Sequence, residues 1–417
     1  MLAYVLNKHG KPLMPCSAAK ARRLLRDEKA KVVRREPFTI QLLYGSSGYR
    51  QPVTLGVDAG SVHIGLSAST VKNELYASDV QLRYDVVELL ATRRELRRRR
   101  RGKKTRYRPN RFNNRKNITE GWLSPSTRNK IDAHLKVIEN VCKILPIVRI
   151  IVETASFDVQ KIKNPDISGV EYQQGEQQNF WNVREYILFR DGHECQHCHG
   201  KSKDKVLNVH HLESRKTGGD APNNLITLCE TCHEAYHAGK IKLKIKRGES
   251  FKDAAFMGIM RWAFFNRLKE IYADIEVKNT YGYITKQKRI ALGLDKAHHI
   301  DAYCIAGNLG AARIGYYFYQ RQMRKHNRQI HKLKFIKGGV RKLNQAPYEI
   351  LGWRLFDKVI CNDEVGFIFG RRANGFFDVR KLDGIKLSAG ISHKKLELIA
   401  KRKTYLSELR KVILLSG

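Results

Sequence analysis

The chain has 417 residues and is strongly basic, with 79 lysine and arginine residues against 40 aspartate and glutamate residues and a net charge of +39. Such an excess repels itself unless a polyanion neutralises it, so nucleic acid is the expected partner and a small-molecule enzyme is disfavoured. A hydrophobic content of 42% excludes global disorder, and the length indicates roughly two to four folded units.

The apolar runs of the chain are too short for a membrane span of roughly 20 residues, and the longest, residues 144–152, contains Pro146 and Arg149. The first residues also lack the basic and apolar regions of a secretory signal. Eight cysteines are too few for a disulfide scaffold in a chain of this length. We therefore expect an intracellular protein with no membrane partner.

The first half of the chain predicts a small basic unit followed by a sheet. Residues 1–50 contain the segment KPLMP, a helical stretch at residues 18–27 and an alternating strand. The run VTLGVD predicts a buried strand that ends at Asp58, and IGLSAST predicts a returning strand. A helix at residues 131–144 and a strand that ends at Glu153 follow, so the pattern predicts an α/β sheet.

A dense basic tract interrupts this sheet: residues 93–116 hold 11 arginines and 3 lysines against one acid, Glu95. Its first half favours a helix that Gly102 and Pro109 end. Because the tract is internal, we interpret it as a surface for a phosphate backbone and not as a solvated tail. The candidate contacts are Arg93, Arg94, Arg97, Arg98, Arg100, Arg101, Arg106, Arg108, Arg111 and Arg115.

The second half predicts a helix at residues 256–272, a polar connection at residues 281–294, and a helix that carries His298 and Asp301 on one face. Residues 311–346 have ten basic and no acidic side chains together with the aromatic run YYFY, which suggests a second nucleic-acid surface. The last ~70 residues predict a small β-rich unit.

Two sets of residues carry the chemistry. Cys195, Cys198, Cys229 and Cys232 form two Cys-x-x-Cys pairs, which predict a closed structural zinc site. Asp58, Glu153 and Asp301, with His298, lie at the ends of several elements. Phosphodiester hydrolysis with two metal ions needs carboxylates placed in this way, although each acid alone is more often a cap or an ion-pair partner.

The segment LNVHHLESRKTGGDAPNNLITLCETCH resembles the HNH nuclease motif, and the resemblance covers residues 191–237. It implies a ββα module with one Mg²⁺, in which His211 is the general base, Asn224 the middle residue and His233 the last histidine. His210, Asn224 and His233 would be the metal-side residues. Neighbouring strand residues point to opposite faces, so His210 and His211 share a site only if the strand ends or bends there. His233 and His237 could face one ion if their segment is helical.

The segments GVDAGSVHIG, IIVETASF and HHIDAYCIAG resemble the three split motifs of RuvC-type, RNase H-like nucleases. This resemblance implies two Mg²⁺ ions held by Asp58, Glu153 and Asp301, with His298 as a metal-side histidine. A split domain of this type with an arginine-rich helix and an HNH insertion is the layout of RNA-guided type II CRISPR effectors. The chain is much shorter than those and resembles their compact transposon-associated relatives, the IscB family, through KPLMP and RYRPNRFNNRKNITEGWLSPS.

The resemblance to IscB covers about residues 1–345 and implies an α/β fold. A split RuvC-like domain would carry an inserted zinc-stapled ββα HNH module, a small N-terminal PLMP domain and a small β-rich C-terminal domain. The expected divisions are PLMP domain 1–50, RuvC-like parts 51–84, 119–180 and 241–312, bridge helix and basic tract 85–118, HNH module 181–240, and basic linker with C-terminal domain 313–417.

The function that this resemblance implies is RNA-guided cleavage of double-stranded DNA. The expected partners of a monomeric protein are an omega guide RNA and target DNA with a short flanking motif, in the cytoplasm of a prokaryote. The HNH module would cut the guide-paired strand and the RuvC-like site the displaced strand. Two alternatives stay open: an unguided, junction-resolvase-like nuclease, and a catalytically idle RNA-binding regulator.

Overall fold

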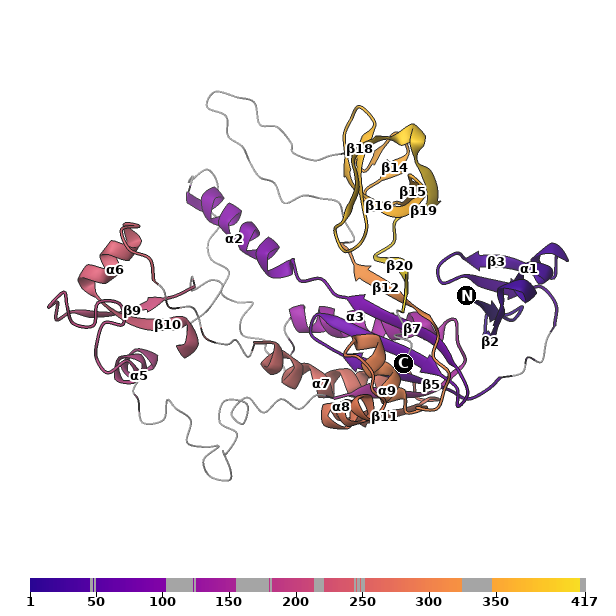
Figure 1. Cartoon of the computed structure of the whole chain (residues 1–417), viewed down its shortest axis with the longest axis horizontal. Helices are drawn as coiled ribbons and strands as arrows, with labels where there is room; N and C mark the ends of the chain where they lie inside the picture. The colour runs from indigo at the N-terminus through magenta and orange to yellow at the C-terminus, as the bar shows by residue number, and fades with distance from the viewer. Residues whose placement is uncertain are drawn as a thin grey trace. The chain divides into compact units, whose positions relative to one another are not determined.

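The computed structural model describes residues 1–45, 48, 50–102, 123, 125–154, 180, 182–213, 221–243, 245, 248, 252–324 and 347–412. The chain divides into two compact units (Figure 1). The larger unit consists of Met1–Ala155 and Ile259–Gly417, and the smaller unit is Ser156–Gly258. Each unit is described by itself.

A seven-stranded sheet forms the centre of the larger unit, in the order β11-β8-β5-β6-β7-β12-β20. Strands β5, β6 and β7 form an antiparallel meander, whereas β8 runs parallel to β5 and β11 parallel to β8. The predicted hairpin and α/β sheet are therefore confirmed. The strands are β5 (Val53–Ala59), β6 (His63–Ser69), β7 (Glu74–Gln81), β8 (Ile147–Glu153), β11 (Glu276–Thr280), β12 (Tyr316–Gln322) and β20 (Tyr405–Lys411).

Four helices accompany the sheet: α3 (Pro125–Cys142), α7 (Lys252–Ile271), α8 (Gly282–Ala291) and α9 (His298–Ala306). Helices α3, α7 and α9 were expected, but the prediction of a polar connection at residues 281–294 is wrong, because these residues include helix α8. Good helix formers fill this segment, Thr285 is buried, and Gly293 adopts a left-handed φ of 61° just after the helix end.

Helix α9 packs on β5 and β6 through two glycines. A Cβ atom on Gly56 would lie 2.0 Å from the carbonyl oxygen of Ala302, and one on Gly65 would lie 1.9 Å from the carbonyl oxygen of His298. Since any side chain would collide with the helix backbone, glycine at both positions is what allows this close approach. The contact brings the first turn of α9 next to the end of β5.

The aromatic run YYFY forms most of β12, which pairs with β7 on one side and β20 on the other. Phe318 is buried, and Tyr317 stacks on His299 with 4.2 Å between ring centroids. These rings therefore pack within the fold instead of forming the exposed surface that was predicted, and β12 joins the sheet beyond the expected boundary at residue 312. The basic residues at positions 325–346 lie outside the described part of the chain.

Two smaller sheets flank the central one within the larger unit. The N-terminal sheet has the order β2-β1-β4-β3 and packs with helix α1; its elements are β1 (Leu2–Leu6), β2 (Pro12–Ser17), α1 (Ala18–Arg26), β3 (Ala30–Arg34) and β4 (Thr39–Leu42). The C-terminal sheet has the order β18-β17-β16-β15-β19, as the β-rich prediction requires. Its strands are β15 (Lys358–Cys361), β16 (Glu364–Arg371), β17 (Phe376–Arg380), β18 (Lys386–Ser392) and β19 (Glu397–Ala400), with the short pair β13 (Glu349–Ile350) and β14 (Trp353–Arg354) beside them.

The basic tract begins as helix α2 (Val86–Gly102), and the residues after Gly102, where the helix is predicted to end, lie outside the described part of the chain. Arg93, Arg94, Arg97 and Arg98 are exposed on this helix. Arg100 and Arg101 belong to the same helix, but their side chains lie outside the description, as do the predicted contacts Arg106, Arg108, Arg111 and Arg115.

The smaller unit contains a ββα module. Helix α5 (Val183–Arg190) precedes strand β9 (Leu207–His211), which pairs antiparallel with β10 (Leu225–Cys229), and helix α6 (Glu230–His237) follows directly. The four predicted zinc ligands lie in the core of this module with Ile226 and Leu228. The expected ββα topology is present.

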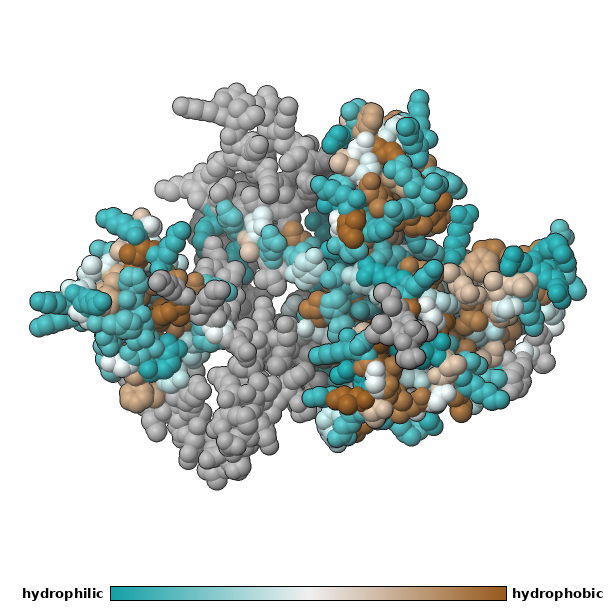
Figure 2. Space-filling model, viewed as in Figure 1, coloured by the Kyte–Doolittle hydropathy of each residue, from teal (hydrophilic) through white to brown (hydrophobic). Residues whose placement is uncertain are grey.

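The face shown in Figure 2 has hydrophilic and hydrophobic side chains interspersed over the described residues. None of the described helices combines the length and the apolar character that a membrane crossing requires.

We predict that Gly65→Ala separates α9 from the sheet and lowers the free energy of unfolding by at least about 2 kcal/mol, because the new methyl group would overlap backbone atoms that cannot rotate away. Chemical denaturation of the two proteins measures this change. The matched control is Gly310→Ala, since a Cβ atom there meets nothing within 4 Å. Equal stability of the two variants would contradict the packing argument.

Candidate functional site

An acidic cluster lies where β5, β8 and α9 meet, and consists of Asp58, Glu153, His298 and Asp301. Asp58 is near the end of β5 and Glu153 is the last residue of β8, while His298 and Asp301 occupy the first turn of α9. The Nδ1 atom of His298 lies 2.7 Å from the Oδ2 atom of Asp58, across 240 positions of sequence. The structure thus brings together the four residues that the sequence singled out.

The carboxylates of the acidic cluster repel one another. Burial, together with the charges of Asp58 and Asp301, raises the pKa of Glu153 to about 7. Burial and the charge of Asp58 also raise the pKa of Asp301, and the hydrogen bond to Asp58 raises that of His298. Acids that oppose each other's ionisation form a donor set that a cation would stabilise.

Helix α8 supplies two residues to the acidic cluster that the sequence analysis missed. The hydroxyl group of Thr285 donates a hydrogen bond of 2.8 Å to Oε2 of Glu153. The Nε atom of Arg289 lies 3.0 Å from Oδ1 of Asp301 in an ion pair of which both side chains are mostly buried. The sequence around these residues indicates a helix only through its helix-forming residues, and its polar composition favours a connection instead.

A second histidine adjoins the acidic cluster from the start of β6. The rings of His63 and His298 stack with 4.9 Å between centroids and an interplanar angle of 3°. The Nδ1 atom of His63 also lies 3.4 Å from Oδ1 of Asp79. His63 therefore supports one face of the His298 ring.

The cysteine cluster of Cys195, Cys198, Cys229 and Cys232 has its four sulfur atoms within 4.8 Å of one another. Although desolvation of the thiol opposes it, hydrogen bonds from Ser202 and the other cysteines lower the pKa of Cys198 to about 6, while burial raises that of Cys232. Four sulfur atoms this close together fit Zn²⁺, which binds thiolates in a tetrahedron. The arrangement is consistent with the predicted structural zinc.

A histidine cluster of His210, His233 and His237 also brings its ligand atoms within 4.8 Å of one another. The Nε2 atom of His210 is buried and has no hydrogen-bond partner among the described residues. Burial and the other histidines lower the pKa of His210 to about 4, so its imidazole is neutral at pH 7 and free to bind a metal. His233 and His237 lie one turn apart on α6, as the helical alternative required.

His211 and Asn224, the other two residues that the resemblance singles out, lie at the end of β9 and directly before β10. His211 is the last residue of β9, opposite Leu225, so the strand ends there, which is the condition under which His210 and His211 can share a site. The side-chain oxygen of Asn224 accepts a hydrogen bond of 2.9 Å from the backbone N–H of Glu213, and its amide group donates one of 3.0 Å to the carbonyl oxygen of Glu213. Asn224 therefore holds the chain just after His211 through two hydrogen bonds to the backbone of Glu213.

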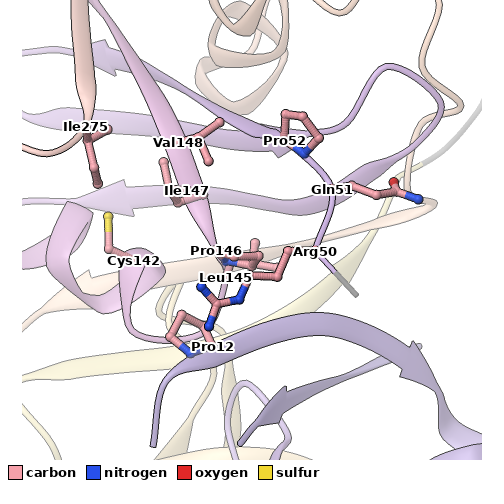
Figure 3. A pocket seen from close by; sticks show the side chains of 10 residues that line it. All are labelled: Pro12, Arg50, Gln51, Pro52, Cys142, Leu145, Pro146, Ile147, Val148 and Ile275. Carbon is pink, nitrogen blue, oxygen red and sulfur yellow. The ribbon is translucent and has the colours of Figure 1, made fainter. Parts of the chain in front are cut away.

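A cavity of about 450 Å³ lies at the starts of the parallel strands β5 and β8 (Figure 3). The acidic cluster lies at the other ends of these strands. Pro52 and Ile147, at the starts of β5 and β8, line it together with Pro12 and Cys142, and Arg50 supplies its only charged side chain among the described lining residues. Its described walls are mostly apolar and contain no group of carboxylates or histidines.

Comparisons with known proteins identify two parts of the chain. Residues 3–175 match the family described as RRXRR protein, and residues 195–239 match the family described as HNH endonuclease. The curated protein Anaredoxin from Nostoc sp. (strain PCC 7120 / SAG 25.82 / UTEX 2576) is 46% identical over 41 residues, which are 10% of this chain and 54% of that protein. The chain thus covers about half the length of this relative.

Among solved structures, Streptococcus thermophilus Cas9 in complex with the AGAA PAM is similar with 13% identity and a TM-score of 0.30, over 44% of this chain and 26% of that one. The complex with the GGAA PAM gives 13% identity and a TM-score of 0.33, over 51% of this chain and 30% of that one. A likeness this partial does not bear on function.

The HNH match covers the cysteine and histidine clusters, so the chain contains an HNH endonuclease domain that holds both of them. The RRXRR match, which precedes it, covers the arginine-rich helix and two of the acids. The two matches in this order bear out the resemblance to RuvC/HNH nucleases of the IscB kind.

We predict that Cys229→Ser removes the zinc and unfolds the ββα module, because Cys229 precedes α6 directly and Cys232 lies within it. Binding of a structural zinc contributes on the order of 10 kcal/mol to folding, more than a small module can lose. Metal analysis and limited proteolysis of the purified chain measure the effect. Cys16→Ser, outside the cysteine cluster, serves as the control; undiminished zinc in the Cys229 variant would refute the assignment.

Proposed function

We propose that this chain is an RNA-guided DNA endonuclease with two independent active sites. The observation that carries the proposal is the occurrence of two hydrolytic clusters in separate compact units, the acidic cluster in the larger unit and the histidine cluster in the smaller one. In this proposal the HNH module cuts the DNA strand paired with the guide, and a RuvC-like site cuts the displaced strand.

The sheet order supports a RuvC-like, RNase H-like assignment for the larger unit. An antiparallel meander, β5 to β7, is extended on the β5 side by the parallel strands β8 and β11, and the acids of β5 and β8 lie at the same end of the sheet. Asp58, Glu153 and Asp301 would hold two Mg²⁺ ions there, and bound ions of this kind stabilise charge on the attacking and leaving oxygens. His298 orients Asp58, while Thr285 and Arg289 orient Glu153 and Asp301.

In the HNH module, His211 is proposed as the general base that removes a proton from the attacking water. The oxygen of that water bonds to phosphorus as the bond to the leaving oxygen breaks, and the leaving oxygen gains a proton. Asn224 fixes the backbone beyond His211 through its two hydrogen bonds to Glu213. His210, His233 and His237 would hold the divalent ion, which supplies positive charge at the scissile phosphate.

The nature of the HNH ion follows from its donors. The expectation from sequence was Mg²⁺, an ion that prefers oxygen ligands, whereas three imidazoles suit transition metals. We therefore propose a divalent transition-metal ion at the histidine cluster and retain Mg²⁺ for the acidic cluster.

Guide binding is proposed for the basic tract. Helix α2 follows β7 in the chain, and its exposed arginines Arg93, Arg94, Arg97 and Arg98 stand at the spacing of one helical surface. Such a helix fits the backbone of an omega RNA better than a specific base sequence. The N-terminal sheet would be the PLMP domain, and the C-terminal sheet would read a short motif that flanks the target DNA.

We predict that Asp58→Ala leaves an enzyme that nicks only the guide-paired strand, and that His211→Ala leaves one that nicks only the displaced strand. Removal of a metal-ligating or general-base group lowers the rate at its own site by at least about a hundredfold. The assay uses the ribonucleoprotein and a matched duplex with a different label on each strand. Loss of both cuts in either single variant would rule out independent sites.

The same preparation separates the alternatives. A single abundant structured RNA that co-purifies with the protein supports guidance, whereas RNA-free protein that cuts branched DNA supports the resolvase-like alternative. Protein that retains RNA but cuts no matched duplex with added divalent ions would support the regulatory alternative.

We predict that the two strands respond differently to metal ions. Replacing Mg²⁺ by Mn²⁺ or Co²⁺ should raise the rate at the HNH strand relative to the other strand, because imidazole prefers the softer ions. Strand-specific rates across metals measure this, with Asp58→Ala and His211→Ala as controls that isolate each site. An unchanged ratio of the two rates would contradict the assignment of the histidine cluster.

A further inference from the structure

A polar cavity with a volume of about 280 Å³ lies on the face of the central sheet opposite the acidic cluster. Asp58 pairs with Gly65, and Gly65 pairs with Asp79, so these residues share one face. Tyr76 precedes Asp79 by three positions in regular pairing and therefore faces the other side. The cavity lies there, between Tyr76, the end of β3, helix α3 and the start of β20.

Three cations from three different elements line this cavity: Arg34 of β3, Lys136 of α3 and Lys403 just before β20. Lys136 bonds to Glu139 at 2.8 Å, whereas Arg34 and Lys403 have no ion-pair or hydrogen-bond partner for their side chains in the described part of the chain. Glu36, the acid of the lining, is paired with Lys358. The described lining of the cavity therefore carries three positive charges against one negative charge.

The like charges are held close together. Burial lowers the pKa of Lys403, the neighbouring charges of Arg34 and Lys358 lower it further, and the charge of Glu36 opposes this in part. A guanidinium group and an ammonium group that line one small cavity are donors that an oxyanion requires.

We propose that this cavity binds a backbone phosphate of a nucleic-acid strand. The guanidinium group of Arg34 can bind two phosphate oxygens at once, and Lys403 adds a point charge. A cavity of this size holds a phosphate with part of its sugar but not a base pair. The site anchors the strand on the far face of the sheet from the acidic cluster, and it takes no part in either hydrolytic reaction.

The proposal requires that the chain bind nucleic acid but not that it be guided. RNA and DNA share the phosphate group, so the test uses both. The full-length protein, without added divalent ions, is titrated with labelled single-stranded RNA and with DNA of the same sequence over a range of salt concentrations. Fluorescence anisotropy gives the dissociation constant at each salt concentration.

We expect the variant Arg34→Ala/Lys403→Ala to bind about tenfold more weakly and to lose about 0.7 to 1 from the slope of log affinity against log salt, which is one phosphate contact. The matched control is Lys31→Ala/Lys72→Ala, which removes the same charge from two exposed lysines outside the cavity. Thermal denaturation shows whether each variant is folded. The variant Arg34→Lys/Lys403→Arg, which keeps both charges, should recover most of the affinity.

The outcomes distinguish the source of the phosphate. A loss confined to RNA assigns the cavity to an RNA strand, a loss confined to DNA assigns it to a DNA strand, and a loss for both shows that either backbone enters. A cavity variant that loses no more affinity and no more slope than the control, for both probes, would overturn the proposal. Cleavage is not measured, so failure here leaves the two-site nuclease proposal unaffected.

Discussion

The backbone contact between helix α9 and strands β5 and β6 is the constraint on which the acidic cluster depends. Gly56 and Gly65 let the carbonyl oxygens of Ala302 and His298 approach the sheet more closely than any side chain would allow. This approach places His298 within hydrogen-bond distance of Asp58 and brings Asp301 to the end of β5. The geometry of the acidic cluster therefore depends on the absence of a side chain at Gly56 and at Gly65.

In the smaller unit, metal ligands hold the helix that carries the functional residues in place. The cysteine cluster contains Cys229, which caps α6, and Cys232 in its first turn, and the next residue is His233 of the histidine cluster. Zinc would therefore fix the position of the helix that presents His233 and His237 toward His210. Because the module has few buried apolar residues, a metal staple replaces the packing that glycines and strands supply in the larger unit.

The features that depend on residues close together in the sequence could be predicted from the sequence. Acids at strand ends and paired cysteines could be predicted because each depends on short spacings, whereas the ββα module was implied by the resemblance of residues 191–237 to the HNH motif. Helix α8 could not, since Thr285 and Arg289 become informative only through Glu153 and Asp301 on other elements. The run YYFY was misassigned because aromatic letters do not distinguish a strand paired on both edges from an exposed stacking surface.

The pairing of β12 with β20 has a further consequence for how such a chain can change. The segment from Met323 to Thr404 leaves the sheet at the end of one strand and returns at the start of its direct neighbour, with Gln322 opposite Tyr405. The C-terminal sheet is thus an insertion whose two ends are fixed at adjacent points, and the backbone N–H of Met323 bonds to the carbonyl oxygen of Thr404 at this neck. An insertion whose two ends are adjacent can be lengthened, shortened or exchanged for another domain while the pairing of β12 with β20 stays intact. Recombination at these two ends would therefore replace the C-terminal sheet without rebuilding the seven-stranded sheet.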